Sequence, residues 1–188
     1  MSTYFRILAA LSVSLSLPPI PANAADETKG KKADQAKSEQ AVGKLASDDI
    51  SFLKAAAADG IAEVKLGELA QEKGSTAEIK EFGKMMVTDH GKANEELQVL
   101  ATAKGVGLPT ELDGEHKSAL DHVNGLSGAE FDKTFMQHMV ADHEKAVADF
   151  TNASQNAKDA ELKAWAAKTL PTLQDHLTQA QAINAKLP

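Results

Sequence analysis

Two octapeptides of nearly identical sequence decide the fold of this chain: MVTDHGKA at residues 86–93 and MVADHEKA at residues 139–146. Each carries an Asp-His pair inside an apolar pattern with a helical period, and each follows a phenylalanine by one turn. A third pair, Asp175-His176, lies in a similar setting near the C-terminus. The sequence therefore predicts helices that bring several histidines into a common apolar core.

Outward from these motifs, the apolar periodicity predicts four long helices. We expect them at residues 47–73, 76–104, 127–154 and 159–185. Ser47 or Asp48 should cap the first helix. Strand-like alternation is absent and the first and last pairs of helices have short loops, so the fold class is all-α and the arrangement an antiparallel four-helix bundle, one domain over residues 47–187.

A long connection at residues 105–128 joins the second helix to the third, with a short helical piece at 113–123. A connection of this length can run along a bundle and join parallel helices, or it can decorate one end. The sequence leaves both arrangements open. Three further histidines are expected outside the functional core, two exposed in this connection and one off the apolar stripe: His116, His122 and His138.

Each long helix carries one polar, metal-competent residue in its apolar stripe, and the four fall near mid-bundle: Glu63, His90, His143 and His176. Burying such groups without partners costs roughly 1–3 kcal/mol each. Convergence on a metal ion removes this cost, and three imidazoles with a carboxylate suit a transition metal such as Fe, Mn, Zn or Cu. The sequence predicts a metal site made of these four residues.

Acidic residues near these ligands form a predicted supporting shell: Asp89, Asp132 and Asp142. An Asp that precedes its own His lies roughly 100° away on the helix. Asp89 and Asp142 are therefore expected to accept the second ring N–H of a histidine on an adjacent helix. Asp132 shares the stripe of the third helix, one turn before its phenylalanine.

Two other interpretations of the polar core stay open. A Glu-His hydrogen-bonded network could stabilise the bundle without any ion, and the protein would then be a non-enzymatic envelope stress or interaction protein. Neutral core histidines could alternatively sense acid. Met86 and Met139, each one turn before a histidine, suit copper, but methionines at helical spacing are commonly core residues.

The sequence favours a binding protein over an enzyme. It has no cysteine, no Gly-rich phosphate loop after a strand and no nucleophile elbow. The Glu-x-x-His pairs of di-iron bundles are also missing, because apolar residues stand three positions before the core histidines: Val87, Val140 and Leu173.

Composition and the N-terminus suggest the compartment. A basic start, a short apolar run and small residues ending at Ala24 predict a signal peptide at residues 1–24, followed by a disordered linker at 25–46. We therefore expect a periplasmic protein with no transmembrane segment after cleavage. A formal net charge of −7 argues against nucleic acid as a partner, and no protein partner is indicated.

Four stretches carry a resemblance to a known family: DDISFLKAAAADGIAEVKLGELA, FGKMMVTDHGKANEEL, FDKTFMQHMVADHEKAVADF and AAKTLPTLQDHL. With these the chain resembles the domain of unknown function 4142 family, secreted bacterial proteins placed with the ferritin-like bundles. The resemblance implies a ferritin-like four-helix fold and an envelope location. Seven residues match its characteristic polar positions: Glu63, Asp89, His90, Asp132, Asp142, His143 and His176. It implies no activity.

Overall fold

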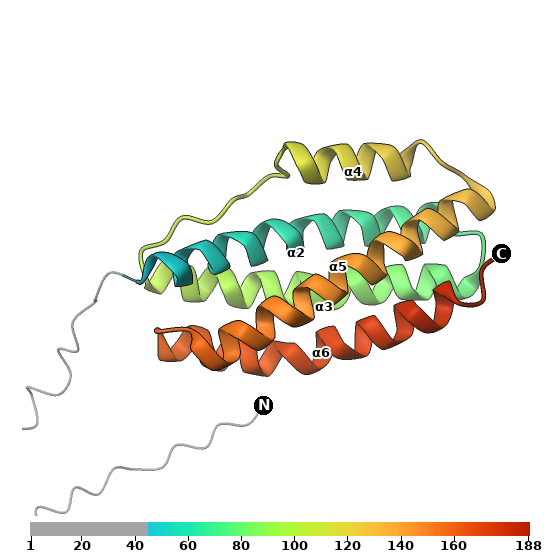
Figure 1. Ribbon diagram of the computed structural model, residues 1–188. Helices are drawn as coiled ribbons and strands as arrows, with labels where there is room; N and C mark the ends of the chain where they lie inside the picture. The colour runs from blue at the N-terminus through green and yellow to red at the C-terminus, as the bar shows by residue number, and fades with distance from the viewer. Residues whose placement is uncertain (1–44) are drawn as a thin grey trace, which may run out of the picture. The chain divides into compact units, whose positions relative to one another are not determined.

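The regular structure of the part of the chain described by the computed structural model, residues 45–188, is entirely helical (Figure 1). Four long helices and one short helix follow in order: α2 (Ser47–Lys73), α3 (Ala77–Ala103), α4 (Gly114–Asn124), α5 (Gly128–Asn156) and α6 (Ala160–Asn184). The predicted all-α class and all five predicted helices are confirmed. The predicted signal peptide and residues 25–44 of the predicted linker lie outside the described residues.

The long helices form two hairpins, α2 with α3 and α5 with α6, and these pack so that α2 contacts α5 and α3 contacts α6. Figure 1 shows α3 and α5 running in the same direction, opposite to α2 and α6. The amide of Ser75, just before α3, donates to Asp132 in the first turns of α5, so both helices begin at one end. The long connection therefore runs along the bundle, and α4 packs on α2 and α5.

One predicted helix cap is wrong. Helix α2 begins at Ser47, so Ala46 occupies the capping position and no side chain caps the helix. Ser127 at the start of α5 likewise makes no capping hydrogen bond. The caps of α3 and α6 use the expected chemistry: Thr76 Oγ1 accepts from the Ile79 amide, and Asp159 accepts from the first-turn amides of α6. The first helix depends instead on its contacts with the neighbouring hairpin.

Two buried carboxylates clamp the hairpins to each other. Asp49, at the start of α2, accepts from the amides of Lys158 (3.1 Å) and Asp159 (2.8 Å) in the α5–α6 loop. Asp132, near the start of α5, accepts from the Ser75 amide (3.0 Å) and hydroxyl in the α2–α3 loop. Both aspartates are almost fully buried. Each hairpin thus satisfies the loop amides of the other.

The apolar core divides into two clusters, one toward each end of the bundle. One cluster includes Phe82, Phe135 and Met139, and the other includes Leu97, Phe150 and Trp165. In every long helix the predicted polar residue lies in sequence between the members of these two clusters. The clusters hold the helices together on both sides of a polar layer, which leaves that layer free to have another function.

Facing glycines bring α2 and α3 unusually close. A Cβ atom on Gly67 would lie 2.6 Å from the Gly83 carbonyl oxygen, and one on Gly83 would lie 2.6 Å from the Gly67 carbonyl oxygen. Backbone atoms cannot move aside as a flexible side chain can, so either substitution forces the helices apart.

We expect Gly67→Ala to lower the free energy of unfolding by about 1–3 kcal/mol, despite the better helix propensity of alanine. Gly91→Ala is the matched control, because a Cβ on Gly91 in α3 meets no atom within 4 Å. That variant should gain up to about 1 kcal/mol. Urea unfolding measures both, and equal stabilisation of the two variants would contradict the close approach.

Candidate metal centre

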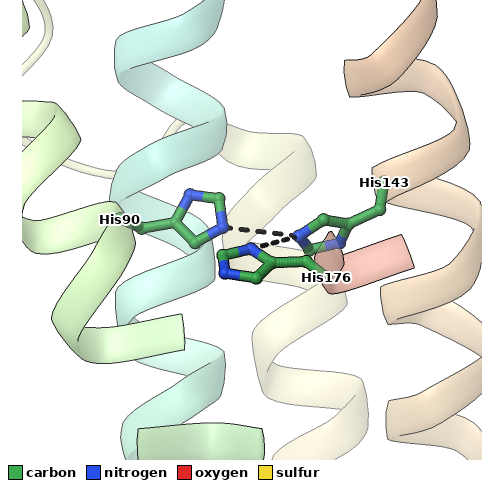
Figure 2. Close-up of side chains that lie close together, drawn as sticks. All are labelled: His90, His143 and His176. Carbon is green, nitrogen blue, oxygen red and sulfur yellow. Dashed lines mark hydrogen bonds between the residues drawn. The ribbon is translucent and has the colours of Figure 1, made fainter. Parts of the chain in front are cut away.

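Three histidines from three helices converge in the polar layer (Figure 2). His143 Nε2 lies 3.4 Å from His90 Nε2 and 3.3 Å from His176 Nδ1. Among residues 45–188, this triad forms the one group of potential metal ligands whose donor atoms all lie within 4.8 Å of one another. The side chains are 9%, 1% and 2% exposed for His90, His143 and His176. The structure therefore brings together three of the four predicted ligands.

Outer hydrogen bonds fix the tautomers of two of these rings. His143 Nδ1 lies 2.9 Å from the Met139 carbonyl oxygen, which can only accept, so Nδ1 carries the proton. His176 Nε2 lies 3.0 Å from Asp89 Oδ2 and donates to that carboxylate. In the neutral rings, His143 Nε2 and His176 Nδ1 are then both unprotonated. Two lone pairs face each other at 3.3 Å.

Glu63 lies beside the triad but on the outer side of His143. Its Oε1 atom is 3.9 Å from His143 Nδ1, the nitrogen that faces away from the other rings. The carboxyl group is buried, and Oε2 has no hydrogen-bond partner. The predicted fourth ligand is therefore next to the centre and not within it, with one oxygen available for another contact.

The electrostatics keep the whole layer neutral. Burial, reinforced by the other two histidines, holds the pKa of His90 well below its ordinary value. Burial lowers the pKa of His143 to about 4 and also lowers the pKa of His176, against the opposing effect of Asp89. Burial, with the charges of Asp142 and Asp59, raises the pKa of Glu63 well above its ordinary value. Neutral imidazoles are the form that binds metals.

The three predicted shell residues have different positions. Asp89 on α3 contacts His176 on the adjacent helix α6, as expected. Asp142 instead pairs with His138 one turn earlier on its own helix, at 2.9 Å. Asp132 does not lie beside the histidines: it binds Ser75 at the end of the bundle, about 16 Å along α5 from His143. Asp132 is buried because it accepts hydrogen bonds from Ser75 in the α2–α3 loop.

A cavity of about 290 Å³ leads from this layer toward α4. Its lining includes Glu63 and His90, and also two histidines that the sequence analysis left outside the site, His116 and His138. His116 is half-buried and not exposed as predicted, because α4 packs on α2 and His116 Nε2 reaches Asp59 at 3.1 Å. His122, by contrast, is exposed as predicted. The pairing of His138 with Asp142 is a helical i,i+4 signal that could have found it.

The lowered histidine pKa values predict acid lability of the metal-free protein. Above the ordinary His value of 6.5 the imidazoles are neutral in both states. As pH falls below 6.5, these histidines bind protons in the unfolded chain. In the folded core they stay neutral until pH reaches their lower folded-state pKa, which is about 4 for His143. The free energy of unfolding therefore falls over this range. Glu63 opposes this trend, because its raised pKa gives stability at low pH that is lost as pH rises through the folded value.

Three histidines outweigh one carboxyl group, so Tm should fall between pH 7 and pH 5. By pH 5, His143 alone contributes a loss of about 2 kcal/mol. Calorimetry of chelator-treated protein measures this, and Glu63→Gln should steepen the fall by removing the opposing group. A Tm that stays flat over this range in both proteins would contradict the neutral core.

Comparison with known proteins gives a family and a fold. The model of the DUF4142 family, described as a domain of unknown function, matches residues 34–183. The sequence matches no curated protein. None of the helices within residues 45–188 is long and apolar enough to span a bilayer.

Solved structures with a similar helical fold include a DUF305 fragment from Deinococcus radiodurans, with TM-score 0.67, 12% identity and coverage of 76% of this chain and 99% of that one. CopM in its Cu(I)-bound form has TM-score 0.60, 18% identity and coverage of 71% and 93%. CopM in its Cu(II)-bound form has TM-score 0.62, 17% identity and coverage of 73% and 95%.

Proposed function

This chain belongs to the DUF4142 family, and we propose that it binds one transition-metal ion in the core of the bundle through His90, His143 and His176. The observation that carries this proposal is the pair of facing lone pairs on His143 Nε2 and His176 Nδ1. No proton lies between them once Met139 and Asp89 have taken the N–H groups. A cation at the convergence point turns this repulsion into coordination.

The spacing of the nitrogens supports a small ion of low coordination number. An ion held tetrahedrally at about 2.0–2.1 Å places its ligand nitrogens about 3.3–3.4 Å apart, and the two measured separations are 3.3 and 3.4 Å. A square-planar ion would need neighbouring nitrogens about 2.8 Å apart. These nitrogen–nitrogen separations therefore favour Cu(I) or Zn(II) over square-planar Cu(II).

Copper is the first ion to test. Met86 and Met139 stand one turn before His90 and His143 and are fully buried on the same stripes, and thioether with imidazole suits Cu(I). CopM, whose solved forms hold Cu(I) and Cu(II), shares the helical fold. This likeness supports the choice of ion to test, while the site itself rests on the histidine geometry.

We infer a role in metal handling or stress protection in the bacterial envelope, following the predicted signal peptide at residues 1–24. Three protein nitrogens leave one position of a tetrahedral ion open for a further ligand, and Glu63 lies on the other side of His143, next to its Nδ1 atom. Holding and releasing an ion requires no further group, so the role that we propose is binding.

Titration of the metal-free protein tests this function. We expect one equivalent of Cu(I) or Zn(II) to bind and to raise Tm, by an amount that corresponds to about 4 kcal/mol when the free ion is 1,000 times its Kd. Elemental analysis of protein purified without chelator or affinity tag should find the same stoichiometry. A protein that binds neither ion, nor Fe or Mn, would instead have a structural histidine network.

A further inference from the structure

The cavity of about 290 Å³ beside the polar layer has its space because small residues line it from four helices. They are Ala56 and Gly60 on α2, Ala93 on α3, Ala119 on α4 and Ala146 on α5. Larger side chains at these positions would fill the space. An apolar cavity of roughly 150 Å³ holds one benzene molecule. This cavity can therefore take an organic molecule that has one aromatic ring and a short chain.

One end of the cavity is aromatic and apolar. Phe150, Trp165 and Leu173 line it there, and all three belong to the same buried apolar cluster. The ring centroids of Phe150 and Trp165 are 5.3 Å apart at an interplanar angle of 50°, and Phe52 packs against both rings. Aromatic rings favour tilted and edge-to-face contacts at such distances. A ligand ring at this end would extend the aromatic group.

The other end carries a polar group that the protein leaves unsatisfied. Glu63 lines the cavity in the polar layer and is only 5% exposed. Its Oε2 atom has no hydrogen-bond partner, and its Oε1 atom lies 3.9 Å from His143 Nδ1, which donates its proton to the Met139 carbonyl. A buried carboxyl group without a hydrogen bond is costly. A ligand hydroxyl would remove this cost, because a hydroxyl both donates and accepts.

The two ends are separated by the length of one small molecule. Glu63 is level with His143, which precedes Phe150 by seven residues on α5. Seven residues of helix correspond to about 10 Å. A ring in contact with Phe150 and a hydroxyl bonded to Glu63, joined by two carbon atoms, span this distance.

The electrostatics of the cavity favour an uncharged molecule. Burial holds the pKa of His90 well below and that of Glu63 well above their ordinary values, so the inner end offers no charged partner. An entering anion would also pass the carboxylates of the exposed rim, on Asp59, Glu115 and Asp142. A charged group that moves from water to such a site loses hydration without a partner to replace it.

We propose that this cavity binds a small, uncharged organic molecule with an aromatic ring and one hydroxyl group, the ring against Phe150 and Trp165 and the hydroxyl on Glu63. The aromatic end, the unsatisfied carboxyl group and the distance between them are each met by one molecule of this class. This site is independent of the proposed metal binding, because His143 and His176 do not line the cavity.

Trp165 is the only tryptophan of the chain, so its fluorescence reports binding directly. Titration of the metal-free protein with phenethyl alcohol should change this fluorescence saturably, with a Kd on the order of 0.1–1 mM for so small a molecule. Phenylacetate and phenethylammonium have a similar skeleton with a charge, and they should bind at least about tenfold more weakly. Glu63→Leu should weaken the alcohol about 3–10-fold, but it should not weaken propylbenzene, which has a methyl group in place of the hydroxyl.

Two variants fill the cavity, Ala146→Leu from α5 and Ala93→Leu from α3, and each should weaken phenethyl alcohol at least about tenfold. Ala148→Leu is the matched control, because Ala148 is exposed on α5 and does not line the cavity. It should bind like wild type. If either filling variant folds and binds the alcohol as tightly as wild type, the proposal is wrong.

The other probes give two further outcomes that would overturn the proposal. If no probe changes the fluorescence of Trp165 or raises Tm, the cavity holds only water. If phenethylammonium binds more tightly than the alcohol, the ligand is a cation and not an uncharged molecule. All of these measurements use metal-free protein, so their failure leaves the core metal site untouched.

Discussion

His143→Ala is expected to abolish metal binding in the core. His143 is the central ring of the triad, since its Nε2 atom makes both of the short nitrogen contacts, to His90 and to His176. Loss of this ligand should weaken binding by more than the roughly 10–100-fold that loss of an outer hydrogen-bond partner costs. The rise of about 4 kcal/mol in stability at 1,000 times the Kd should disappear with it. Isothermal titration and calorimetric Tm with and without the ion measure the two effects.

Two further variants are compared with His143→Ala, one with an expected intermediate effect and one with none. Asp89→Asn keeps the shape of the carboxylate but weakens its hold on the His176 N–H, so it should cost about 10–100-fold in affinity. His122→Ala removes an exposed histidine and should change nothing. Stoichiometric, tight binding by His143→Ala would show that the ion binds elsewhere. A loss of stability without any effect of an ion on wild type would favour the structural network.

Removal of a loop clamp is expected to have the largest effect on stability. Asp49 accepts amide protons of Lys158 and Asp159, and its side chain is 3% exposed. Asp49→Ala removes the acceptor of two part-buried amides. A fully buried donor without a partner costs about 1–3 kcal/mol, and water can reach part of these amides, so we expect a loss of about 2–4 kcal/mol. Asp132→Ala should cost a similar amount through Ser75. Urea unfolding of the metal-free protein measures both.

These variants also separate structure from metal binding. Asp132 is a predicted shell residue from sequence, but its partners lie at the end of the bundle, so Asp132→Ala should bind one equivalent of metal like wild type. Asp48→Ala is the matched control for Asp49, because Asp48 is its exposed neighbour in the first turn. It should lose less than about 1 kcal/mol. If the Asp132→Ala variant folds but does not bind the ion, Asp132 supports the metal site as the sequence predicted.

The division of the core explains how the bundle tolerates its polar layer. Phe82, Phe135 and Met139 belong to one apolar cluster, and Leu97, Phe150 and Trp165 to the other. Apolar burial on both sides holds the four helices in place independently of the histidines between them. The layer can then keep imidazoles neutral and close together, at a cost in stability that the binding of an ion offsets.

The sequence by itself determined the secondary structure and the position of the site along the length of the helices. Apolar residues repeat at the helical period, and glycines, prolines and polar residues interrupt the pattern between helices, so the helix bounds follow from local chemistry. The stripes also identified His90, His143 and His176 as core residues, because a residue's azimuth on a helix depends only on its position in the sequence. The contact of Asp89 with an adjacent helix follows from the same rule.

Only the tertiary structure decided the direction of the long connection and the partners of the remaining polar groups. α3 and α5 run in parallel because the connection that contains α4 runs along the bundle, and a connection of that length permits either path. Burial alone could not separate Asp132, which binds a loop, from Glu63, which borders the metal centre. His116 and His138 joined the cavity because helix packing placed them there. Contacts between segments far apart in sequence depend on that packing, and local periodicity does not encode it.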